Sequence, residues 1–284
     1  MNCKGKVVVI TGATSGLGQA AAIEFAKQGA KVYVIGRDSA RANETVSAAK
    51  AAGGDAEVIL GDVSTRAGVQ ALANAVLAKT QKIDVLLNNA GGNFKNMVKT
   101  ADGIESTFAL NTVGAYQLEK LLHPAIAAAK GRVVNVATGF LDRFPVEVDS
   151  LVEPKKFSTF GTYAAAKHAS VMMTVEQAKR YAGDGVTAVS VHPGIIMGTR
   201  FGGGQPKIAQ MIGGPIMRAI GFACTLEEAV RRFGVACFDD VPSGSYMQKG
   251  QPTPLPKQSN EEPVRAKVVE LLEKLSTGAE ARVA

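Results

Sequence analysis

The stretch Thr11-Gly12-Ala13-Thr14-Ser15-Gly16-Leu17-Gly18 follows an apolar run and decides how the chain is interpreted. Gly12 permits a tight turn, Gly16 lets a ligand approach the backbone, and Gly18 lets a following helix pack closely on the strand. A helical pattern begins inside the run, so the helix would present free N–H groups and the positive end of its dipole. The spacing is G-x-x-x-G-x-G rather than G-x-G-x-x-G, and a glycine-rich βα turn can also be purely structural. At the first strand of an alternating series, the run predicts a phosphate-binding loop.

Short runs rich in Val, Ile and Leu alternate along the chain with longer Ala-rich stretches. Near-continuous apolar runs of this length are typical of strands buried on both faces of a parallel sheet. Strands are predicted at Lys6–Thr11, Lys31–Arg37, Ala56–Val63, Ile83–Ala90, Arg132–Ala137 and Val186–His192, and helices at Leu17–Gln28, Ala40–Ala52 and Gly103–Ala129. Gly29 and Gly53 stand where C-terminal caps belong. This alternation predicts an α/β single-domain Rossmann fold, a doubly wound parallel sheet with helices on both faces.

The chain lacks a Pro/Ser-rich linker and an internal repeat, so residues 1–284 are expected to form one domain. After Gly194 the pattern changes to glycine breaks and an apolar stretch, which predicts a substrate lid around 195–224. The apolar stretch 208–224 is interpreted as a lid helix packed on the core, with a partner or membrane-surface helix as the alternative. A Pro-rich segment, Pro252–Pro256, then precedes a helical extension around 260–276.

Composition excludes several classes of protein. Hydrophobic residues make up 46% and charged residues 20%, as in an ordinary globular protein, and no stretch reaches the roughly 18 apolar residues of a transmembrane segment. The net charge is +7, but the basic residues are scattered, so nucleic acid is not expected as a partner. The three cysteines and three histidines have no metal-ligand spacing, so no metal is expected, and reduced thiols favour a cytoplasmic location.

The end of the second predicted strand indicates which dinucleotide the loop would bind. An Asp or Glu there binds the ribose hydroxyls of NAD, whereas a nearby Arg accommodates the 2′-phosphate of NADP. Here the acidic position is Gly36 and Arg37 follows, which favours NADP(H) over NAD(H). Asp62 and Val63, after the third strand, would hold the adenine side. The alternative is that Arg37 is a surface charge paired with Asp38.

Five motifs in this order resemble the short-chain dehydrogenase/reductase family. They are T-G-x-x-x-G-x-G at 11–18, Asn88-Asn89-Ala90-Gly91, Asn111, Tyr163-x-x-x-Lys167 and Pro193-Gly194. The resemblance covers nearly the whole chain. The long insert Gly139–Thr162, Leu226-Glu227-Glu228-Ala229 and Ser243-Gly244-Ser245-Tyr246 are similar to the branch with retinol dehydrogenase-like and WW-domain oxidoreductase-like members. Residues 1–284 contain no stretch like the membrane anchor of many of those members, so a retinoid substrate or a microsomal location is not expected from the resemblance.

The resemblance implies a nicotinamide cofactor held by further residues. These are Thr14, Ser15 and Leu17 in the loop, Asn89, Ala90 and Gly91 after the fourth strand, and Pro193, Gly194, Ile196 and Thr199 after the sixth. Thr199 falls one place later than the threonine usual in the family. Asn111 would hold a backbone carbonyl and a water that relays protons to Lys167.

Tyr163 and Lys167 lie four residues apart, so on a helix they share one face. A free tyrosine has a pKa near 10, and a nearby ammonium lowers it. Tyr163 is therefore expected to act as acid or base in hydride transfer, while Lys167 also positions the cofactor. Thr138 stands where the family usually has Ser, so it keeps a hydroxyl donor but adds a methyl group and a stiffer χ1.

The expected substrate is a small apolar carbonyl compound or its alcohol. The side chains expected to line its site are Phe140, Leu141, Phe144, Ile195, Met197, Phe201, Met211, Ile212 and Met217. The predicted function is an NADP(H)-dependent short-chain oxidoreductase, a carbonyl reductase or alcohol dehydrogenase. The alternatives are a cofactor-retaining isomerase or dehydratase on the same fold, and a catalytically weak dinucleotide-sensing protein. A homo-oligomer is compatible with the sequence.

Overall fold

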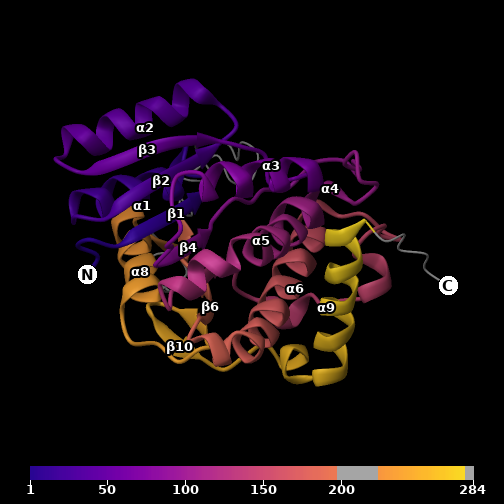
Figure 1. Cartoon of the computed structure of the whole chain (residues 1–284). Helices are drawn as coiled ribbons and strands as arrows, with labels where there is room; N and C mark the ends of the chain where they lie inside the picture. Colours follow the sequence, from indigo (N-terminus) through magenta and orange to yellow (C-terminus); the bar gives the residue numbers. More distant parts are fainter. Residues whose placement is uncertain (197–222, 279–284) are drawn as a thin grey trace.

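An eight-stranded sheet forms the centre of the protein (Figure 1). The computed structural model describes residues 1–196 and 223–278, so the predicted Met197, Thr199, Phe201, Met211, Ile212 and Met217 lie outside the described residues. The strands are β1 (Val7–Thr11), β2 (Lys31–Gly36), β3 (Asp55–Leu60), β4 (Val85–Asn88), β5 (Arg132–Val136), β6 (Thr187–His192), β9 (Tyr246–Gln248) and β10 (Gln251–Thr253). Their order is β10-β9-β6-β5-β4-β1-β2-β3, and every pair is parallel except β9–β10. The predicted fold class is confirmed, with an antiparallel hairpin added at one edge.

The strand order reverses at β1, which pairs with β2 on one side and with β4 on the other. The carboxyl ends of these parallel strands meet at the same edge of the sheet. In open α/β sheets, ligands bind at the carboxyl ends of the strands beside such a switch point. The Gly-rich stretch after β1 and the Asn88–Gly91 stretch after β4 therefore lie side by side where a ligand is expected.

Helices cover both faces of the sheet (Figure 1). On one face, α1 (Gly16–Lys27), α2 (Ser39–Ala51) and α8 (Leu226–Phe238) pack around a core that includes Phe25 and Phe233. On the other face, α3 (Arg66–Leu77), α5 (Gly114–Ala128) and α6 (Thr159–Arg180) pack around a second core that includes Leu72 and Leu118. Gly29 and Gly53 follow α1 and α2 with φ of +93° and +83°, so they take the left-handed cap conformation predicted for them.

Two predicted element boundaries were wrong for local reasons. The third strand ends at Leu60 rather than Val63, because Asp62 turns the chain by accepting hydrogen bonds from the amide and hydroxyl of Ser64. The long helix predicted at 103–129 begins as a short turn, α4 (Ser106–Phe108), which Glu105 caps. It then widens into a π-helical turn, η1 (Ala109–Val113), before α5.

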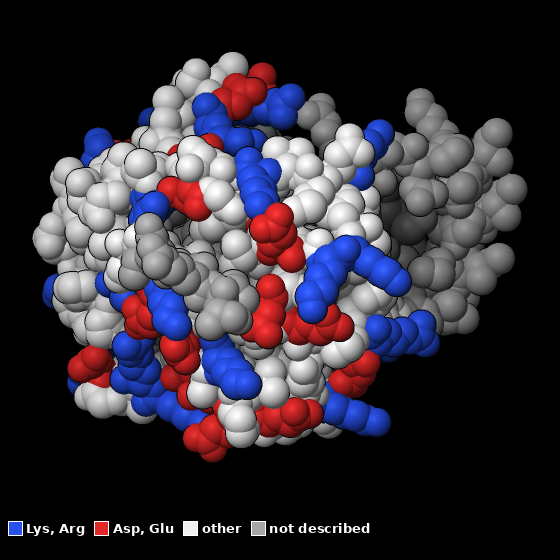
Figure 2. Space-filling model, turned by 90° about the vertical axis from the view of Figure 1, so that its right-hand side faces the viewer, with Lys and Arg blue, Asp and Glu red and all other residues white. Residues whose placement is uncertain are grey.

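The last described helix, α9 (Glu262–Thr277), lies along α6 on the right of Figure 1. Glu273 of α9 pairs with Lys120 of α5 and Arg180 of α6, and Arg265 pairs with Glu176 at 2.6 Å. Figure 2 shows acidic and basic side chains interspersed on this face, without a continuous basic patch. Within residues 1–196 and 223–278, no helix has the length and apolar character needed to cross a membrane.

A second, small sheet joins two segments that are distant in sequence. Strand β7 (Ile195–Ile196) pairs in parallel with β8 (Ala223–Cys224). Thr225 then starts α8 with a capping box, in which its hydroxyl accepts from the Glu228 amide and the Glu228 carboxylate accepts from the Thr225 amide. Residues 196 and 223, which bound the two described ranges, therefore lie in the same small sheet.

Candidate functional site

The Gly-rich loop is held between β2 and β4. Gly12 has a φ of +65°, and an added Cβ there would come 2.8 Å from the Ala90 Cα. The Asn89 side-chain amide donates to the carbonyl oxygens of Thr11 and Gly12 at 2.9 and 3.1 Å, and the Ala90 amide donates to the Thr11 hydroxyl at 3.0 Å. Asn89 therefore fixes the loop, while Ala90 is tied to the same strand end.

The start of α1 fits the phosphates of a dinucleotide. Ser15 is the N-cap in an extended conformation, and its side chain makes no capping hydrogen bond, so it does not occupy the free amides of the helix. Gly16 has a φ of +56°, and a Cβ there would meet no atom within 4 Å, so the backbone faces open space. A Cβ on Gly18 would lie 2.5 Å from the Gly12 carbonyl oxygen, which explains the third glycine. These features form a backbone cradle of the kind that binds pyrophosphate.

The end of β2 carries a cation beside this cradle. The side chain of Thr14 fills the space that a Cβ on Gly36 would need. The Arg37 side chain is 71% exposed, and its Nη1 lies 3.7 Å from the Asp62 carboxylate. Asp38 instead caps α2 and pairs with Arg41 at 3.4 Å. Arg37 is thus an exposed surface charge, as the alternative held, but it pairs with Asp62 rather than Asp38 and so joins the β2 end to the Asp62 turn.

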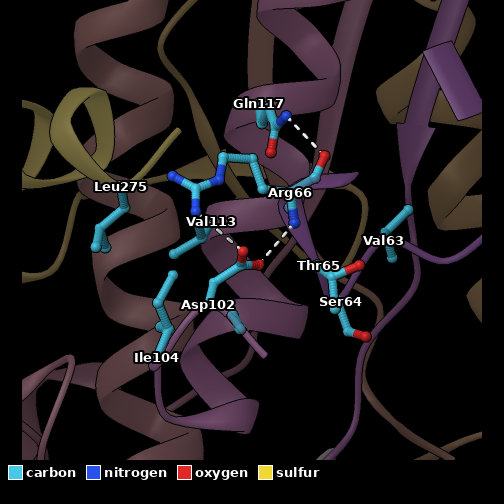
Figure 3. A pocket seen from close by; sticks show the side chains of 11 residues that line it. Val63, Ser64, Thr65, Arg66, Asp102, Ile104, Val113, Gln117 and Leu275 are labelled. Carbon is cyan, nitrogen blue, oxygen red and sulfur yellow. Dashed lines mark hydrogen bonds and ion pairs between the residues drawn. The ribbon is translucent and has the colours of Figure 1, made fainter. Parts of the chain in front are cut away.

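A small pocket lies behind the Asp62–Thr65 turn (Figure 3). Its volume is about 10 Å³, roughly the size of one water molecule. Figure 3 shows the Asp102 carboxylate bridging the backbone amide and the guanidinium of Arg66, at 2.8 and 3.1 Å. Gln117 of α5 donates to the Arg66 carbonyl oxygen at 3.1 Å. These contacts fix the start of α3 and, with it, the turn that carries Asp62 and Val63.

Asn111 lies in the π-helical turn, a helix type that is frequent at functional sites. Its amide nitrogen donates to the carbonyl oxygens of Gly92 and Thr107 at 2.7 Å each, and its oxygen accepts from the Gly92 amide at 3.2 Å. A Cβ on Gly91 would come 2.7 Å from the Asn111 oxygen and 3.3 Å from the Lys167 Nζ. The structure therefore brings Asn111, Lys167 and Gly91 together at the carboxyl end of β4.

Tyr163 and Lys167 are both buried on α6. The Lys167 ammonium donates to the Val136 carbonyl oxygen at 2.6 Å, and burial lowers its pKa to about 7. The expectation that Lys167 lowers the pKa of Tyr163 was wrong: burial raises this pKa above its usual value, and a hydrogen bond with the Thr138 side chain offsets the rise only in part. The site thus contains a protonated phenol and an amine whose charged form is disfavoured by burial.

Thr138 is fixed from both sides. Its hydroxyl interacts with Tyr163, and its carbonyl oxygen accepts a hydrogen bond of 2.6 Å from the Tyr246 hydroxyl on β9. The Tyr246 ring is buried with Ala137 and Leu141. Sequence reasoning assigned Tyr246 only to a branch motif; its place in the Ser243–Tyr246 motif is the signal that could have indicated a role at the site.

The turn after β6 is held by α8. Gly194 has a φ of +105°, and a Cβ there would come 2.5 Å from the Cys224 sulfur. Arg232 donates to the Pro193 carbonyl oxygen at 2.8 Å, a contact that the sequence did not indicate. Burial and the Arg232 charge lower the pKa of His192 to about 4. Pro193, Gly194 and Ile196 therefore stand at the carboxyl end of β6, on the same edge as Thr138.

The insert after Thr138 supplies aromatic side chains near Tyr163. Phe144 packs edge-on against Phe160 with ring centroids 5.1 Å apart, and Phe160 lies 6.4 Å from the Tyr163 ring. Phe140 is 40% exposed. Leu141 is buried against the sheet and anchors the insert. Among residues 1–196 and 223–278, no group of three or more His, Cys, Asp and Glu is arranged to hold a metal ion.

Comparisons with known proteins agree with this geometry. The family model described as short chain dehydrogenase matches residues 6–205. Retinol dehydrogenase 12 of Mus musculus is 36% identical over 196 residues, which cover 68% of this chain and 62% of that protein. A Streptomyces sp. (strain C5) protein with the provisional name daunorubicin C-13 ketoreductase is 30% identical over 253 residues, covering 88% of this chain and 85% of that protein.

A comparison with solved structures finds the same fold. An uncharacterized protein from Mycobacterium Paratuberculosis superposes with a TM-score of 0.77 at 26% identity, covering 96% of this chain and 94% of that chain. The chain spans about three fifths of the length of the retinol dehydrogenase 12 relative. The match over residues 6–205 includes the loop after β1, Asn111, Tyr163 and Lys167. The chain belongs to the short-chain dehydrogenase family.

Proposed function

We propose that the protein is an NADP(H)-preferring oxidoreductase that interconverts a small apolar carbonyl compound and its alcohol, with Tyr163 as the acid or base. The observation that carries the proposal is the hydrogen bond between the Thr138 and Tyr163 side chains, together with the Lys167 ammonium bonded to the Val136 carbonyl oxygen two residues before Thr138. Two relatives support the reaction class, because one is named retinol dehydrogenase and another carries a ketoreductase name.

The residues around the loop would hold the cofactor, which supplies or accepts the hydride when it is bound. The cradle of Gly12, Ser15 and Gly16 fits the pyrophosphate, and the exposed Arg37 offers a cation for a 2′-phosphate. Asp62 and Val63 stand at the adenine side, and Asn89 keeps the cradle in place. We propose NADP(H) rather than NAD(H) because Gly36, in the acidic position, offers no carboxylate for the ribose hydroxyls.

Side chains of the protein would donate or accept the proton that accompanies hydride transfer. Tyr163 is protonated at neutral pH, so it can donate to the oxygen of a carbonyl as negative charge develops there. The Thr138 hydroxyl can donate to the same oxygen. Lys167 has a pKa of about 7, well below that of Tyr163, so its ammonium would return a proton to the Tyr163 phenolate with a favourable change in free energy. In the direction of alcohol oxidation the same groups carry the proton the other way.

Apolar side chains support an apolar substrate. Phe144 packs on Phe160, whose ring lies next to Tyr163, so the two provide an aromatic surface near the phenol. We propose a cytoplasmic setting on the basis of three cysteines that are all free thiols.

Absorbance of NADPH during a screen of ketones and aldehydes tests the function. Wild type should consume NADPH, and Tyr163→Phe should lower kcat by about 10²–10⁴-fold while NADPH still binds. Full activity in the variant would contradict the assigned role. Tight NADPH binding without turnover across the panel would point to a sensing protein, and substrate conversion without net NADPH loss would point to an isomerase or dehydratase.

A further inference from the structure

The insert Gly139–Thr162, which follows Thr138, contributes no strand to the eight-stranded sheet. Its two short 3-10 turns, η2 (Leu141–Arg143) and η3 (Val148–Ser150), flank the segment that presents Phe144 to Phe160. We call residues 142–146 the wall segment. Such irregular backbone needs partners from elsewhere in the fold, because its polar groups do not satisfy one another.

The partner of the wall segment is a distant 3-10 turn, η5 (Lys257–Asn260), which lies between the β9–β10 hairpin and α9. The Gln258 side chain pairs with both backbone groups of Val146. Its oxygen accepts from the Val146 amide at 2.7 Å, and its nitrogen donates to the Val146 carbonyl oxygen at 3.0 Å. The Gln258 side-chain amide thereby satisfies both backbone hydrogen-bonding groups of Val146, as a neighbouring strand would.

A second contact reaches the same segment at its other end. The Lys257 amide donates to the Asp142 carboxylate at 2.6 Å. Together with Gln258, it fastens both ends of the wall segment to η5. Val146 itself is buried in the core that α6 and α9 share, so the segment is also held by apolar contacts.

His168 makes the third connection and links the wall to α6. Its Nδ1 lies 3.0 Å from the Phe144 carbonyl oxygen, and its Nε2 lies 3.1 Å from the Ser259 hydroxyl. A carbonyl only accepts, so Nδ1 carries the hydrogen and Nε2 accepts from Ser259. Burial lowers the pKa of His168, which agrees with a neutral ring.

Ser259 is in turn fixed by α9. Its carbonyl oxygen accepts from Arg265 at 2.8 Å, and Arg265 pairs with Glu176 of α6 at 2.6 Å. The side chain of Arg265 is only 7% exposed, so this pair is well shielded from water. The rigid helices α6 and α9 therefore determine where η5 lies, and η5 determines where the wall segment lies.

We propose that Gln258 is a positioning residue that, with the His168–Ser259 pair, holds the wall segment beside Tyr163 and so determines which carbonyl substrates fit. The inference rests on the proposed function for its substrate, but the contacts that carry it do not involve the cradle after β1. Loss of Gln258 should loosen the wall segment and leave the cofactor site and the sheet unchanged. Large substrates, which need Phe144 and Phe160 in place, should suffer most.

A series at position 258 tests this inference. Gln258→Met keeps the length of the side chain and removes both hydrogen bonds. Gln258→Glu keeps an acceptor for the Val146 amide but places an oxygen against the Val146 carbonyl. Asn260→Ala is the matched control, because the Asn260 amide donates to the carbonyl oxygen of Pro256, the residue before η5, at 3.5 Å and, among the described residues, not to the wall segment.

Three measurements are compared across the series: kcat and KM for a bulky aromatic ketone and for a small aliphatic ketone, NADPH affinity by fluorescence, and amide exchange in residues 140–148. Gln258→Met should raise KM for the bulky ketone about tenfold. The small ketone and NADPH affinity should change less than about twofold, and exchange in 140–148 should become faster. Gln258→Glu should fall between Gln258→Met and wild type, and Asn260→Ala should match wild type.

Other outcomes contradict the inference. Equal losses for both ketones together with weaker NADPH binding would show that Gln258 only supports the global fold. Unchanged selectivity and unchanged exchange in Gln258→Met would show that Val146 does not depend on it. If wild type turned over neither ketone, the proposed function would fail separately, and amide exchange would still decide whether Gln258 holds the wall segment.

Discussion

Thr138 hydrogen-bonds the phenol of Tyr163 through its side chain, while its own carbonyl oxygen is held by Tyr246 at 2.6 Å. The residue that departs from the family's usual serine thus keeps the hydroxyl in place. Since Thr138 lies two residues after the end of β5, the register of that strand sets the position of the hydroxyl.

Thr138→Val should lower kcat/KM by about 10²–10³-fold, because it removes a hydroxyl donor at the reacting oxygen while keeping the shape of the side chain. The lost hydrogen bond should also raise the pKa of Tyr163 further, so the alkaline limb of the pH–rate profile should move to higher pH. Steady-state kinetics across pH provides the measurement. Thr138→Ser is the control and should equal or exceed the wild-type rate; a large loss would mean that the site depends on the threonine methyl group.

Arg37→Ala should weaken NADPH binding by about tenfold or more and change NADH binding little. The guanidinium is exposed beside the cradle, and a charge-assisted hydrogen bond to phosphate contributes about 1.5–3 kcal/mol. Fluorescence titration with both cofactors measures the effect. Arg231→Ala, which removes the same charge from an exposed position on α8, should leave both affinities unchanged. Equal weakening of NADPH and NADH by Arg37→Ala would contradict the assignment.

Asp102→Asn should weaken both cofactors alike, by a few-fold. The carboxylate bridges the Arg66 amide and guanidinium and is 15% exposed, so it fixes the turn that carries Asp62 and Val63, the residues proposed to hold the adenine side. Lost stabilisation of about 1 kcal/mol would lower Tm by about 2–4 °C. Calorimetry and titration with NADPH and NADH provide the test. Lys99→Ala, which breaks a far more exposed pair with Glu153, is the control and should change neither Tm nor cofactor affinity. If Asp102→Asn weakened NADPH binding but not NADH binding, Asp102 would instead act on the 2′-phosphate.

Glu119→Gln should stabilise the protein at pH 8–9 and change little at pH 4–5. Burial raises the pKa of Glu119 to about 8 from its usual 4.5, so between these values the folded state binds more protons than the unfolded state. The free energy of unfolding contributed by Glu119 is therefore fully present below pH 4.5 and is lost as pH rises through 8. A pKa difference of one is worth about 1.4 kcal/mol.

Urea unfolding of wild type and Glu119→Gln across pH 4–9 checks this prediction. A glutamine keeps an oxygen for the Asn88 amide, which donates to Glu119 at 2.9 Å. The two curves should converge at low pH and separate at high pH. Parallel curves across the whole range would mean that Glu119 has the same proton affinity in the folded and unfolded states.

The sequence predicted the sheet because its strands follow a strong local rule. Apolar runs such as Val7–Ile10 are typical of strands buried on both faces of a parallel sheet, and the glycine at position 12 suits a tight turn with positive φ. The edge strand β3 was the least clear, because Glu57 faces Lys31 and Lys79 at the edge of the sheet and interrupts the apolar pattern.

The site was predictable where function depends on residues near one another in sequence or on family motifs. Tyr163 and Lys167 share a helix face, and Asn89 follows β4 directly. Tyr246 and Arg232 were not predicted, because each acts on a backbone carbonyl more than 35 positions away and leaves no periodic signal. A contact of that kind depends on tertiary packing, which sequence spacing does not record.

The parallel pairing of β7 with β8 has a consequence for engineering. Ile195 pairs with Ala223 and Ile196 with Cys224, so Ile196 and Ala223, which bound residues 197–222, are diagonal neighbours in one two-residue ladder. Closing a flexible connection of different length between such ends changes the closure free energy by only about 0.6 kcal/mol for each doubling of length. We therefore expect that a connection of different length can join Ile196 to Ala223 without changing the register of the main sheet, because β7 and β8 form a separate sheet.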